Sequence, residues 1–541
     1  MNARSDASTD VDVAIVGCGP VGAVAANFLG AAGLTCAVLE RETNAHGQPR
    51  AFSCDDEALR IYQQIGLVDE LRAGMRAADV VDYTGVGNRR FAEVHLSALD
   101  LGSGYSPLHF FHQPTLETTL RAGLRRFPAV SLRLGCEVTG LRKEADGATL
   151  ELRERAGPST LSARYVLACD GAHSAVRRFV GIEMHGARYT EMWLAIAGFA
   201  PPEALRVPNT RFVCDPARPC FVGLGPANEL RIEPMVLPHE DPFELERPEE
   251  IRRLIAPFVD PDHYRVTRAA AYGFGKHVAA QWRSGPVFLL GDAAHQMPPF
   301  MGQGLVSGLR DVANLAWKLA LVLRGAADPT LLDSYEVERR AHTQAMIDIS
   351  VRMGHLFLTR NPLRARLRDA IFGELQRIDR FRRFIRDFEF KPPPRIERGC
   401  IAGGVGSRHS PQGAYFPQTR VTAAHGESMS DDSLGPGFAF VAHDADPRAY
   451  DRHGTLAALG ARLVRVRAPG PVDALPGVVD LADPSGRLTE WFEHHRAAFA
   501  LVRPDRYVFG AAPASRAAAL VDELARTLAS VTSGSPRRGD T

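Results

Sequence analysis

The feature that most constrains this chain is a glycine-rich turn between two apolar runs near its start. Residues 11–16 are mainly apolar and rich in β-branched side chains, which predicts a buried parallel strand. The sequence Gly17-Cys-Gly19-Pro20-Val-Gly22 follows at once, and residues 23–32 are small and predict a helix. A second apolar run, residues 34–39, ends at Glu40. Strand, G-x-G-x-x-G, helix, strand and acid together predict a Rossmann-type dinucleotide site.

Each glycine of this turn has a separate physical role. Gly17 permits the tight turn, Gly19 lets the backbone approach a pyrophosphate, and Gly22 allows the helix to pack closely on the strand. The helix start offers free N–H groups to phosphate oxygens. Glu40 follows Gly22 at the spacing where an acid accepts from a ribose hydroxyl. The fingerprint alone does not distinguish NAD from FAD, although its place at the start of a long chain favours FAD.

Two later segments repeat the pattern of a strand that ends in polar and glycine residues. Residues 165–169 form an apolar run before Asp170-Gly171, which suits a second approach to a pyrophosphate. Residues 286–290 form another apolar run before Gly291-Asp292, whose acid could accept from a ribityl hydroxyl. A loop containing Pro299, Gly302 and Gly304 then opens a long helix. The free N–H groups of that helix start can stabilise negative charge, such as that at N1 of a reduced flavin.

Composition excludes several classes of protein. The 541 residues suggest about three or four domain-sized units. The net charge of +1 gives no basic excess for nucleic acid, and no run of 18 apolar residues predicts a membrane helix. The eight cysteines show no zinc spacing and the N-terminus shows no secretory signal, so we expect a cytoplasmic chain without a structural metal. The chain has only four lysines and 60 arginines, an imbalance that mostly reflects coding bias. Some of these arginines could bind phosphates or carboxylates through their planar guanidinium groups.

The chain changes character after a Pro-rich stretch at residues 391–395. Beyond Cys400, five short apolar runs alternate with helix-like segments near Leu456 and Trp491. A final amphipathic helix carries Leu520, Leu524 and Leu528 at helical spacing. These patterns predict a separate α/β domain.

The three nucleotide segments, in this order, resemble the group A FAD-dependent aromatic hydroxylases, the superfamily of para-hydroxybenzoate and phenol hydroxylases. The similarity is greater still to 3-(3-hydroxyphenyl)propionate hydroxylases and covers nearly the whole chain. The residues that carry it are Pro49-Arg-Ala51, Asp55–Leu59, Gly66–Asp69, Cys214–Pro216, Arg218-Pro219, Asn314–Ala320, Glu338–Arg340, Ala345–Asp348 and Arg503–Arg506.

The resemblance implies an α/β fold in three domains. A discontinuous Rossmann-type FAD-binding domain would comprise residues 1–75, 105–183 and 284–395. A β-sheet substrate domain interleaved with it would comprise residues 76–104 and 184–283. Residues 400–541 would form a thioredoxin-like C-terminal domain, which lacks a C-x-x-C pair and is therefore assigned a packing or dimer role.

The resemblance also assigns roles to residues outside the glycine turn. Arg41 matches the basic residue that follows the ribose-binding acid, and Gln113 matches a polar residue near the ribityl chain. Arg50 matches an arginine beside the flavin pyrophosphate and the nicotinamide path. Arg177 lies close enough to the Asp170-Gly171 motif to join Arg41 and Arg50 at the phosphates. The implied cofactor-binding set is Gly17, Gly19, Pro20, Gly22, Glu40, Arg41, Arg50, Gln113, Asp170, Gly171, Gly291, Asp292, Pro299, Gly302 and Gly304, of which Arg50, Pro299, Gly302 and Gly304 would also serve catalysis.

The implied activity is NAD(P)H-dependent hydroxylation of a phenol by O₂ through a flavin C4a-hydroperoxide. NADH or NADPH would bind only transiently, since a second G-x-G-x-x-G is absent from the sequence. The resemblance favours a 3-(3-hydroxyphenyl)propionate-like substrate in aromatic catabolism. The loop at residues 298–302 follows the general superfamily form, which leaves a polycyclic polyketide substrate open.

The residue that accepts the phenol proton is not identified by the sequence. The residue types that could do so are His46, His109, His277, His295, Tyr189 and Tyr272. A flavin- or nucleotide-binding protein without hydroxylase activity is the alternative from another class. A flavin halogenase is a weaker alternative because the chain has no Trp-x-Trp-x-Ile-Pro stretch. The remaining expectations are a possible homodimer, no membrane and no nucleic-acid partner.

Overall fold

The computed structural model describes residues 9–44, 51–97, 99–407, 409–424, 426–470 and 474–529. The chain divides into two compact units. The first contains residues 1–101, 105–309 and 344–392, and the second contains residues 102–104, 310–343 and 393–541. In the part of the chain that the structure describes, no helix combines the length and apolar character needed to cross a membrane.

The first sheet of unit 1 is the predicted nucleotide-type sheet. Its parallel strands are β18 (Val287–Leu289), β11 (Gly157–Ala168), β1 (Val11–Val16), β2 (Cys36–Glu40) and β8 (Val130–Leu134), in that spatial order. Three antiparallel strands extend it: β9 (Glu137–Glu144), β10 (Gly147–Glu154) and β17 (Arg283–Ser284). The strands that precede the three glycine segments are therefore neighbours, so their carboxyl ends meet at one edge.

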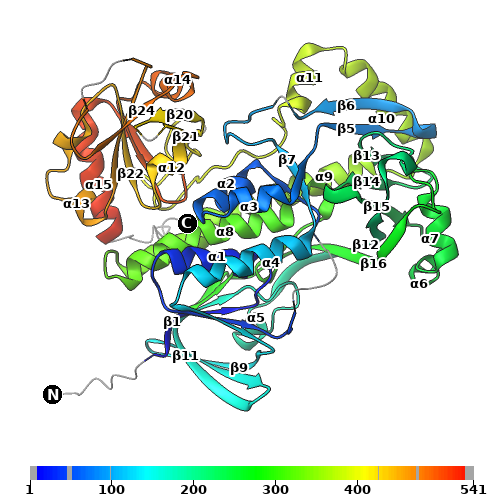
Figure 1. Ribbon diagram of the computed structural model, residues 1–541, viewed down its shortest axis with the longest axis horizontal. Helices are drawn as coiled ribbons and strands as arrows, with labels where there is room; N and C mark the ends of the chain where they lie inside the picture. Colours follow the sequence, from blue (N-terminus) through cyan, green and yellow to red (C-terminus); the bar gives the residue numbers. More distant parts are fainter. Residues whose placement is uncertain are drawn as a thin grey trace, which may run out of the picture. The chain divides into compact units, whose positions relative to one another are not determined.

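Two helices lie side by side along this sheet (Figure 1). The first, α1 (Pro20–Ala31), begins with proline at its first position, where the missing N–H costs nothing. The second is α4 (Gln113–Gly123). Because the residues of α1 that face the sheet are small and buried, the helix packs closely on β1 and β2. The sequence predictions of this strand, helix and second strand are confirmed.

The second sheet of unit 1 is mainly antiparallel and carries two long strands, β12 (Met184–Phe199) and β16 (Arg265–Ala279) (Figure 1). Its other strands are β19 (His295–Gln296), β15 (Glu229–Val236), β14 (Cys220–Leu224), β13 (Thr210–Val213), β5 (Val80–Thr84) and β6 (Arg90–His95). One face packs Leu194, Ile196 and Ile232 against α6 (Pro242–Leu245) and α7 (Pro248–Ile255). The prediction of a sheet in the middle of the chain is confirmed.

Smaller elements complete unit 1. A short sheet contains β3 (Ser53–Asp55), β7 (Leu108–Phe111) and β4 (Met75–Ala77). The helices are α2 (Asp56–Gln64), α3 (Val68–Ala73), α5 (Ala175–Phe179), α10 (Pro362–Leu375), α11 (Asp379–Arg386) and parts of α8 (Gln303–Leu323) and α9 (Ser334–Phe357).

Unit 2 contains a seven-stranded sheet with helices beside it. Its strands, in spatial order, are β21 (Gly426–Met429), β20 (Arg420–Ala423), β24 (Val478–Ala482), β23 (Arg462–Arg467), β22 (Ala439–His443), β25 (Phe499–Val502) and β26 (Val508–Ala512). The helices are α12 (Ser430–Leu434), α13 (Thr455–Ala458), α14 (Arg487–His494) and α15 (Ala517–Ala529). Each of the five predicted apolar runs overlaps one strand, namely β22, β23, β24, β25 or β26, and the predicted final helix is α15. The strands β20 and β21 were not predicted.

A fully buried ionic cluster lies in unit 2. Glu338 accepts hydrogen bonds through one carboxylate oxygen from Lys318 Nζ at 2.8 Å, Arg503 Nη2 at 2.7 Å and Asn314 Nδ2 at 2.6 Å. Arg503 also pairs with Asp505 at 2.6 Å. The side chains of Lys318, Glu338, Arg503 and Asp505 have no exposed surface. Their mutual pairing offsets the cost of burying four charges.

Candidate functional site

The glycine turn after β1 has the shape that the fingerprint requires. Gly17 has a φ of +94°, and a Cβ there would lie 2.5 Å from the carbonyl oxygen of Cys169 on the neighbouring strand. A Cβ on Gly22 would overlap the carbonyl oxygen of Gly17. Gly19 differs, because no heavy atom lies within 4 Å of the position that a Cβ there would take. Its φ is an ordinary −70°. Two glycines are therefore needed for packing, while Gly19 leaves the start of α1 open, just before Pro20.

Glu40 lies at the end of β2 and holds this turn in place. Its Oε2 accepts from the backbone N–H of Cys18 at 2.7 Å. Arg121 on α4 donates to the carbonyl of Cys18 at 2.8 and 3.1 Å. The acid therefore lies beside the glycine turn, as the sequence predicts.

Three polar residues outside the glycine turn, Arg41, Gln113 and Arg50, were also predicted to bind the cofactor. Arg41 is mostly exposed and pairs with its neighbour Glu42 at 3.1 Å. Gln113 is buried at the start of α4, where its Oε1 accepts from the backbone N–H of Ala51 at 2.7 Å. Arg50 lies outside the described residues.

The second segment follows β11 and contains a buried acid. Asp170 accepts from the backbone N–H of Val176 at 3.1 Å through Oδ2, and burial raises its pKa. Its Oδ1 is buried without a hydrogen-bond partner among the described residues. Gly171 has a φ of +77° and faces open space within 4 Å. A buried oxygen of this kind, beside an open glycine, is typical of a ligand site.

Arg177 links the second and third segments. Its guanidinium donates to the carbonyl of Ala293 at 3.0 Å and to that of Ala172 at 3.1 Å. Those two carbonyls follow Gly171 and Asp292 in the chain, so the arginine fixes the distance between the two loops. The sequence indicated that Arg177 lies near Asp170, but it did not indicate this structural role.

The third segment brings the start of α8 close to the start of α1. Gly291 has a φ of +57°, and its Cα lies within 3.1 Å of the position that a Cβ on Gly308 would take. A Cβ on either glycine would lie within 3.2 Å of Val21 Cγ2 on α1. Asp292 is exposed at this point. The first and third glycine segments therefore pack against each other.

The loop before α8 packs between two β-elements. Gly302 has a φ of +63°, and a Cβ there would lie 2.7 Å from Ser53 Oγ on β3. Phe300 places its ring 6.2 Å from that of Trp193 and 5.1 Å from that of Phe274. Pro299 is exposed, and Gly304 faces open space within 4 Å. The helix start after this loop is therefore accessible.

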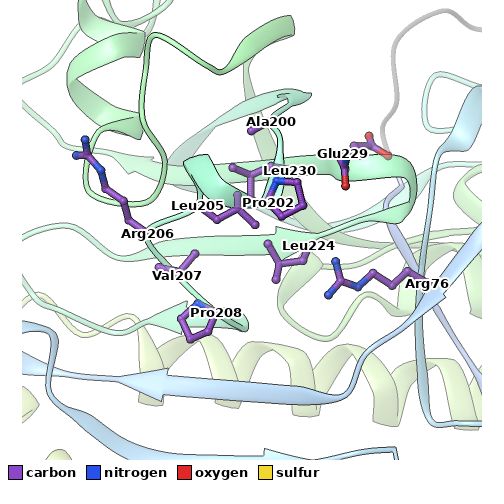
Figure 2. Close-up of a pocket in the computed structure, with 11 residues that line it drawn as sticks. Arg76, Ala200, Pro202, Leu205, Arg206, Val207, Pro208, Leu224, Glu229 and Leu230 are labelled. Carbon is purple, nitrogen blue, oxygen red and sulfur yellow. The ribbon is translucent and has the colours of Figure 1, made fainter.

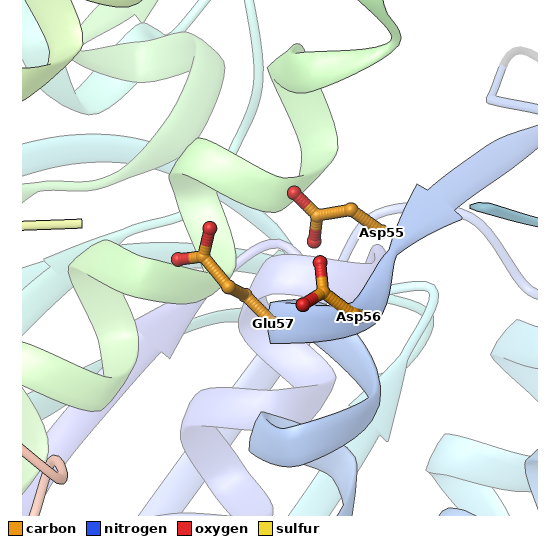
Figure 3. Close-up of side chains that lie close together, drawn as sticks. All are labelled: Asp55, Asp56 and Glu57. Atoms are coloured by element: carbon orange, nitrogen blue, oxygen red, sulfur yellow. The ribbon is translucent and has the colours of Figure 1, made fainter. Parts of the chain in front are cut away.

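An acidic triad supports this loop and was not identified from the sequence as a unit. The carboxylate oxygens of Asp55, Asp56 and Glu57 lie within 4.8 Å of one another (Figure 3). Lys391 Nζ pairs with Asp55 at 2.7 Å and with Glu57 at 3.0 Å. Gln303 also donates to Asp55, at 3.2 Å. The triad thus connects the first turn of α8 to α2 and to the Pro-rich stretch through an ion pair.

Of the histidines and tyrosines that could accept the phenol proton, those that the structure describes lie on several strands. Tyr272 on β16 donates to Glu233 Oε2 at 2.9 Å. His109 on β7 is buried, and this burial lowers its pKa to about 4. His295 is buried on β19 beside Trp282, and His277 is paired in register with Gln296. His46 and the Tyr189 side chain lie outside the described residues.

A surface pocket of about 490 Å³ lies at one end of the long-stranded sheet (Figure 2). Arg76, Leu224 and Glu229 are among its lining residues. Glu229 is 3% exposed, and its Oε2 has no hydrogen-bond partner among the described residues. Burial raises its pKa to about 7, and Arg231 partly opposes this shift. The pocket is therefore lined by a carboxyl group that is largely protonated below neutral pH.

We expect Glu229→Gln to reduce the pH dependence of stability. The pKa of Glu229 in the folded protein exceeds its ordinary value of 4.5. The stability that Glu229 contributes is therefore fully present below pH 4.5 and is lost as the pH rises to about 7. In the wild type this group should lower the free energy of unfolding by about 2–3 kcal/mol across that window. Urea unfolding of both proteins at several pH values measures the difference. Parallel pH profiles would contradict the assignment.

Comparison with protein-family models identifies two regions. Residues 10–350 match the family described as FAD binding domain, and residues 413–527 match the family described as HcaD C-terminal domain. The first match contains all three glycine segments and the long-stranded sheet.

Relatives and solved structures agree with these matches. The chain is 36% identical to a 3-(3-hydroxy-phenyl)propionate/3-hydroxycinnamic acid hydroxylase of Mycobacterium avium (strain 104), over 98% of this chain and 94% of the relative. It is 28% identical to p-nitrophenol 4-monooxygenase PnpA from Pseudomonas putida DLL-E4, with a TM-score of 0.66 over 71% of this chain and 98% of that one. The flavin-dependent monooxygenase PieE shares the fold, with a TM-score of 0.76 at 23% identity over 96% of this chain and 100% of that one.

These matches cover the glycine turn, the buried Asp170 and the loop before α8, whose geometry the sequence fingerprint predicts. The identity to the hydroxylase relative extends through the C-terminal unit as well. The chain belongs to the family of FAD-dependent aromatic hydroxylases built on this FAD binding domain.

Proposed function

We propose that this enzyme hydroxylates a phenolic acid of the 3-(3-hydroxyphenyl)propionate type, using FAD, O₂ and NADH or NADPH. The observation that carries the substrate class is the 36% identity to a hydroxylase of that name over nearly the full length of both chains. A role in catabolism of aromatic compounds follows from this substrate.

The residues present fit FAD. Gly19, Gly171 and Gly304 leave open space beside their loops, and the loop of Gly19 approaches that of Gly171 where Gly17 packs on Cys169. Asp170, next to Gly171, carries a buried oxygen without a partner among the described residues. We propose that FAD is held by Gly17, Gly19, Pro20, Gly22, Glu40, Arg41, Arg50, Gln113, Asp170, Gly171, Gly291, Asp292, Pro299, Gly302 and Gly304. Bound FAD would supply the redox chemistry that couples NAD(P)H oxidation to oxygen transfer.

The protein's own groups would bind the pyrophosphate, stabilise negative charge on the reduced cofactor and exclude water from the reacting region. The open N–H groups at the start of α1 would bind the pyrophosphate, because a helix start favours anions. The start of α8 at Gln303 and Gly304 would stabilise negative charge on the reduced cofactor in the same way. The rings of Phe300 and Trp193 would exclude water from the reacting region, so that oxygen is transferred to the substrate.

We also propose the domain boundaries predicted above and a thioredoxin-like fold for residues 400–541. The strand order β23-β22-β25-β26 supports this fold, since β22 is parallel to β23 and antiparallel to β25. A homodimer and a cytoplasmic location remain predictions.

Two measurements test this function. The visible absorption spectrum of the purified protein should show bound flavin, and a panel of phenols should be screened for stimulated NAD(P)H oxidation with either coenzyme. We expect stimulation by 3-(3-hydroxyphenyl)propionate and related acids. A protein that cannot be reconstituted with FAD would be a non-catalytic relative. Stimulation by polycyclic phenols alone would favour the polyketide alternative.

A further inference from the structure

The long-stranded sheet has one apolar face and one polar face. The apolar face packs on α6 and α7. On the other face, cross-strand register pairs Trp193 with Tyr272, and Ala197 with both Arg268 and Arg231. Directly paired residues project to the same side of a sheet. Trp193, Tyr272, Arg231 and Arg268 therefore share the polar face.

This polar face lies against the loop that precedes α8. Phe300 of the loop packs on Trp193 and Phe274, as described above. The Arg231 guanidinium lies 5.5 Å from the centre of the Phe52 ring, and a Cβ on Gly302 would lie 2.7 Å from Oγ of the adjacent residue Ser53. The arginines, the aromatic rings and the proposed flavin-binding loop therefore belong to one region of unit 1.

The residues between the charged and aromatic side chains are small. Ala195 is paired with Ala270, and Gly223 is paired with Arg231 on the next strand. Ala195 and Ala197 are buried, and Ala270 is partly exposed. A floor of alanine and glycine permits a flat ring to lie close to the sheet, which larger side chains would prevent.

The polar groups of this face interact with one another. Arg231 Nε donates to Glu233 Oε1 at 2.5 Å, and Tyr272 donates to the other oxygen of Glu233 at 2.9 Å. Burial raises the pKa of Tyr272 well above its usual range, Glu233 raises it further, and the charges of Arg231 and Arg268 oppose this shift. Arg231 and the Tyr272 hydroxyl are therefore held by the two oxygens of one carboxylate.

The buried indole of Trp193 adds an independent observation. Its side chain is 4% exposed, and Nε1 has no hydrogen-bond partner among the described residues. A buried N–H of this kind is normally satisfied, so it indicates a place where a ligand oxygen is bound.

Given the hydroxylase function proposed above, we propose that Arg231 and Arg268 bind the carboxylate of the phenolic acid. The planar fork of a guanidinium matches two carboxylate oxygens, and the interaction is strengthened by charge. The aromatic ring would then lie over Ala195, Ala197 and Ala270, with the loop at Phe300 opposite. Glu233 and Tyr272 act as positioning residues, because Glu233 fixes both Arg231 and the tyrosine hydroxyl.

Arg268→Met tests this assignment in the FAD-loaded enzyme. Dissociation constants are measured from the change in flavin absorbance on titration with 3-(3-hydroxyphenyl)propionate and with 3-propylphenol, which lacks the carboxylate. We expect the constant for the acid to rise by roughly 10- to 100-fold, the range for hydrogen bonds to charged groups. The constant for the neutral phenol should change little. Arg268→Lys should give an intermediate result, since it keeps the charge but not the fork.

Arg265→Met is the matched control. Arg265 lies on the same strand, but its guanidinium packs over the Phe199 ring at 4.9 Å. This substitution should leave both dissociation constants unchanged. Flavin content and the melting temperature of each variant show whether the protein remains folded.

Three outcomes would overturn the inference. An equal loss of affinity for both ligands would make Arg268 a structural residue only, and unchanged affinity for the acid would exclude it from the site. A wild type that hydroxylates neutral or polycyclic phenols but not the acid would leave the hydroxylase function intact and reject the carboxylate site. A wild type that holds FAD but responds to no phenol would instead reject the proposed function itself.

Discussion

Replacing Gly19 with valine should leave the chain folded and abolish its capacity to retain FAD. Gly19 has an ordinary φ and faces open space, so the backbone accommodates a side chain there. The loss of a glycine cap should cost only about 1 kcal/mol of stability. The added methyl groups would fill the space in front of α1, where the pyrophosphate is proposed to approach. The ratio of flavin to protein absorbance should fall from stoichiometric to near zero, with a small change in melting temperature.

Gly22→Ala is the comparison that separates packing from cofactor binding. Its Cβ would overlap the carbonyl oxygen of Gly17, which is backbone and cannot move independently. We expect a lower melting temperature for this variant whether or not FAD is supplied. Stoichiometric FAD in Gly19→Val would contradict the proposed position of the pyrophosphate.

Replacing Glu338 with alanine should cause a large loss of stability. The substitution would leave Lys318 and Arg503 buried with Asp505 as the remaining carboxylate of the cluster. Removing one partner of a buried ion pair costs about 3–5 kcal/mol, because the remaining charge is no longer compensated. Since the chain has two compact units, calorimetry should resolve the expected decrease in the transition of unit 2.

An exposed ion pair gives the matched control for this prediction. Glu374 pairs with Arg377 at 2.9 Å, and both side chains are mostly exposed. Glu374→Ala should change the free energy of unfolding by less than about 1 kcal/mol. The paired charges hold the pKa of Glu338 well below its usual range, so its contribution is present at neutral pH and declines only in strong acid. Equal effects of the two substitutions would show that the cluster does not stabilise unit 2.

Local patterns in the sequence predicted local structure well. The strand before Gly17, the proline-led helix and the acid at Glu40 follow from period, glycine and capping rules that act within a few residues. The same rules located five strands of the C-terminal unit but not β20 and β21. The located strands are largely buried, so their apolar runs are continuous, whereas β20 and β21 carry exposed polar residues.

Contacts between distant residues could not be predicted in this way. Arg503 and Glu338 lie 165 positions apart, so nothing in either segment indicates that they pair. Arg177 was expected near the phosphates, yet it donates to two backbone carbonyls that the fold brings together. The sequence of β16 shows only weak alternation of apolar and polar residues, because its polar face carries small, aromatic and charged side chains. Its partners become evident only from the cross-strand register.

The most direct test of the central claim is the fate of isotopic oxygen. The FAD-loaded enzyme is supplied with NADH or NADPH, ¹⁸O₂ and 3-(3-hydroxyphenyl)propionate, and the product is analysed by mass spectrometry. Hydroxylation predicts a ring-hydroxylated acid that carries a single labelled oxygen atom, formed in proportion to the coenzyme consumed. Coenzyme oxidation that yields only hydrogen peroxide, with no labelled product from this acid or any other phenol, would contradict the account.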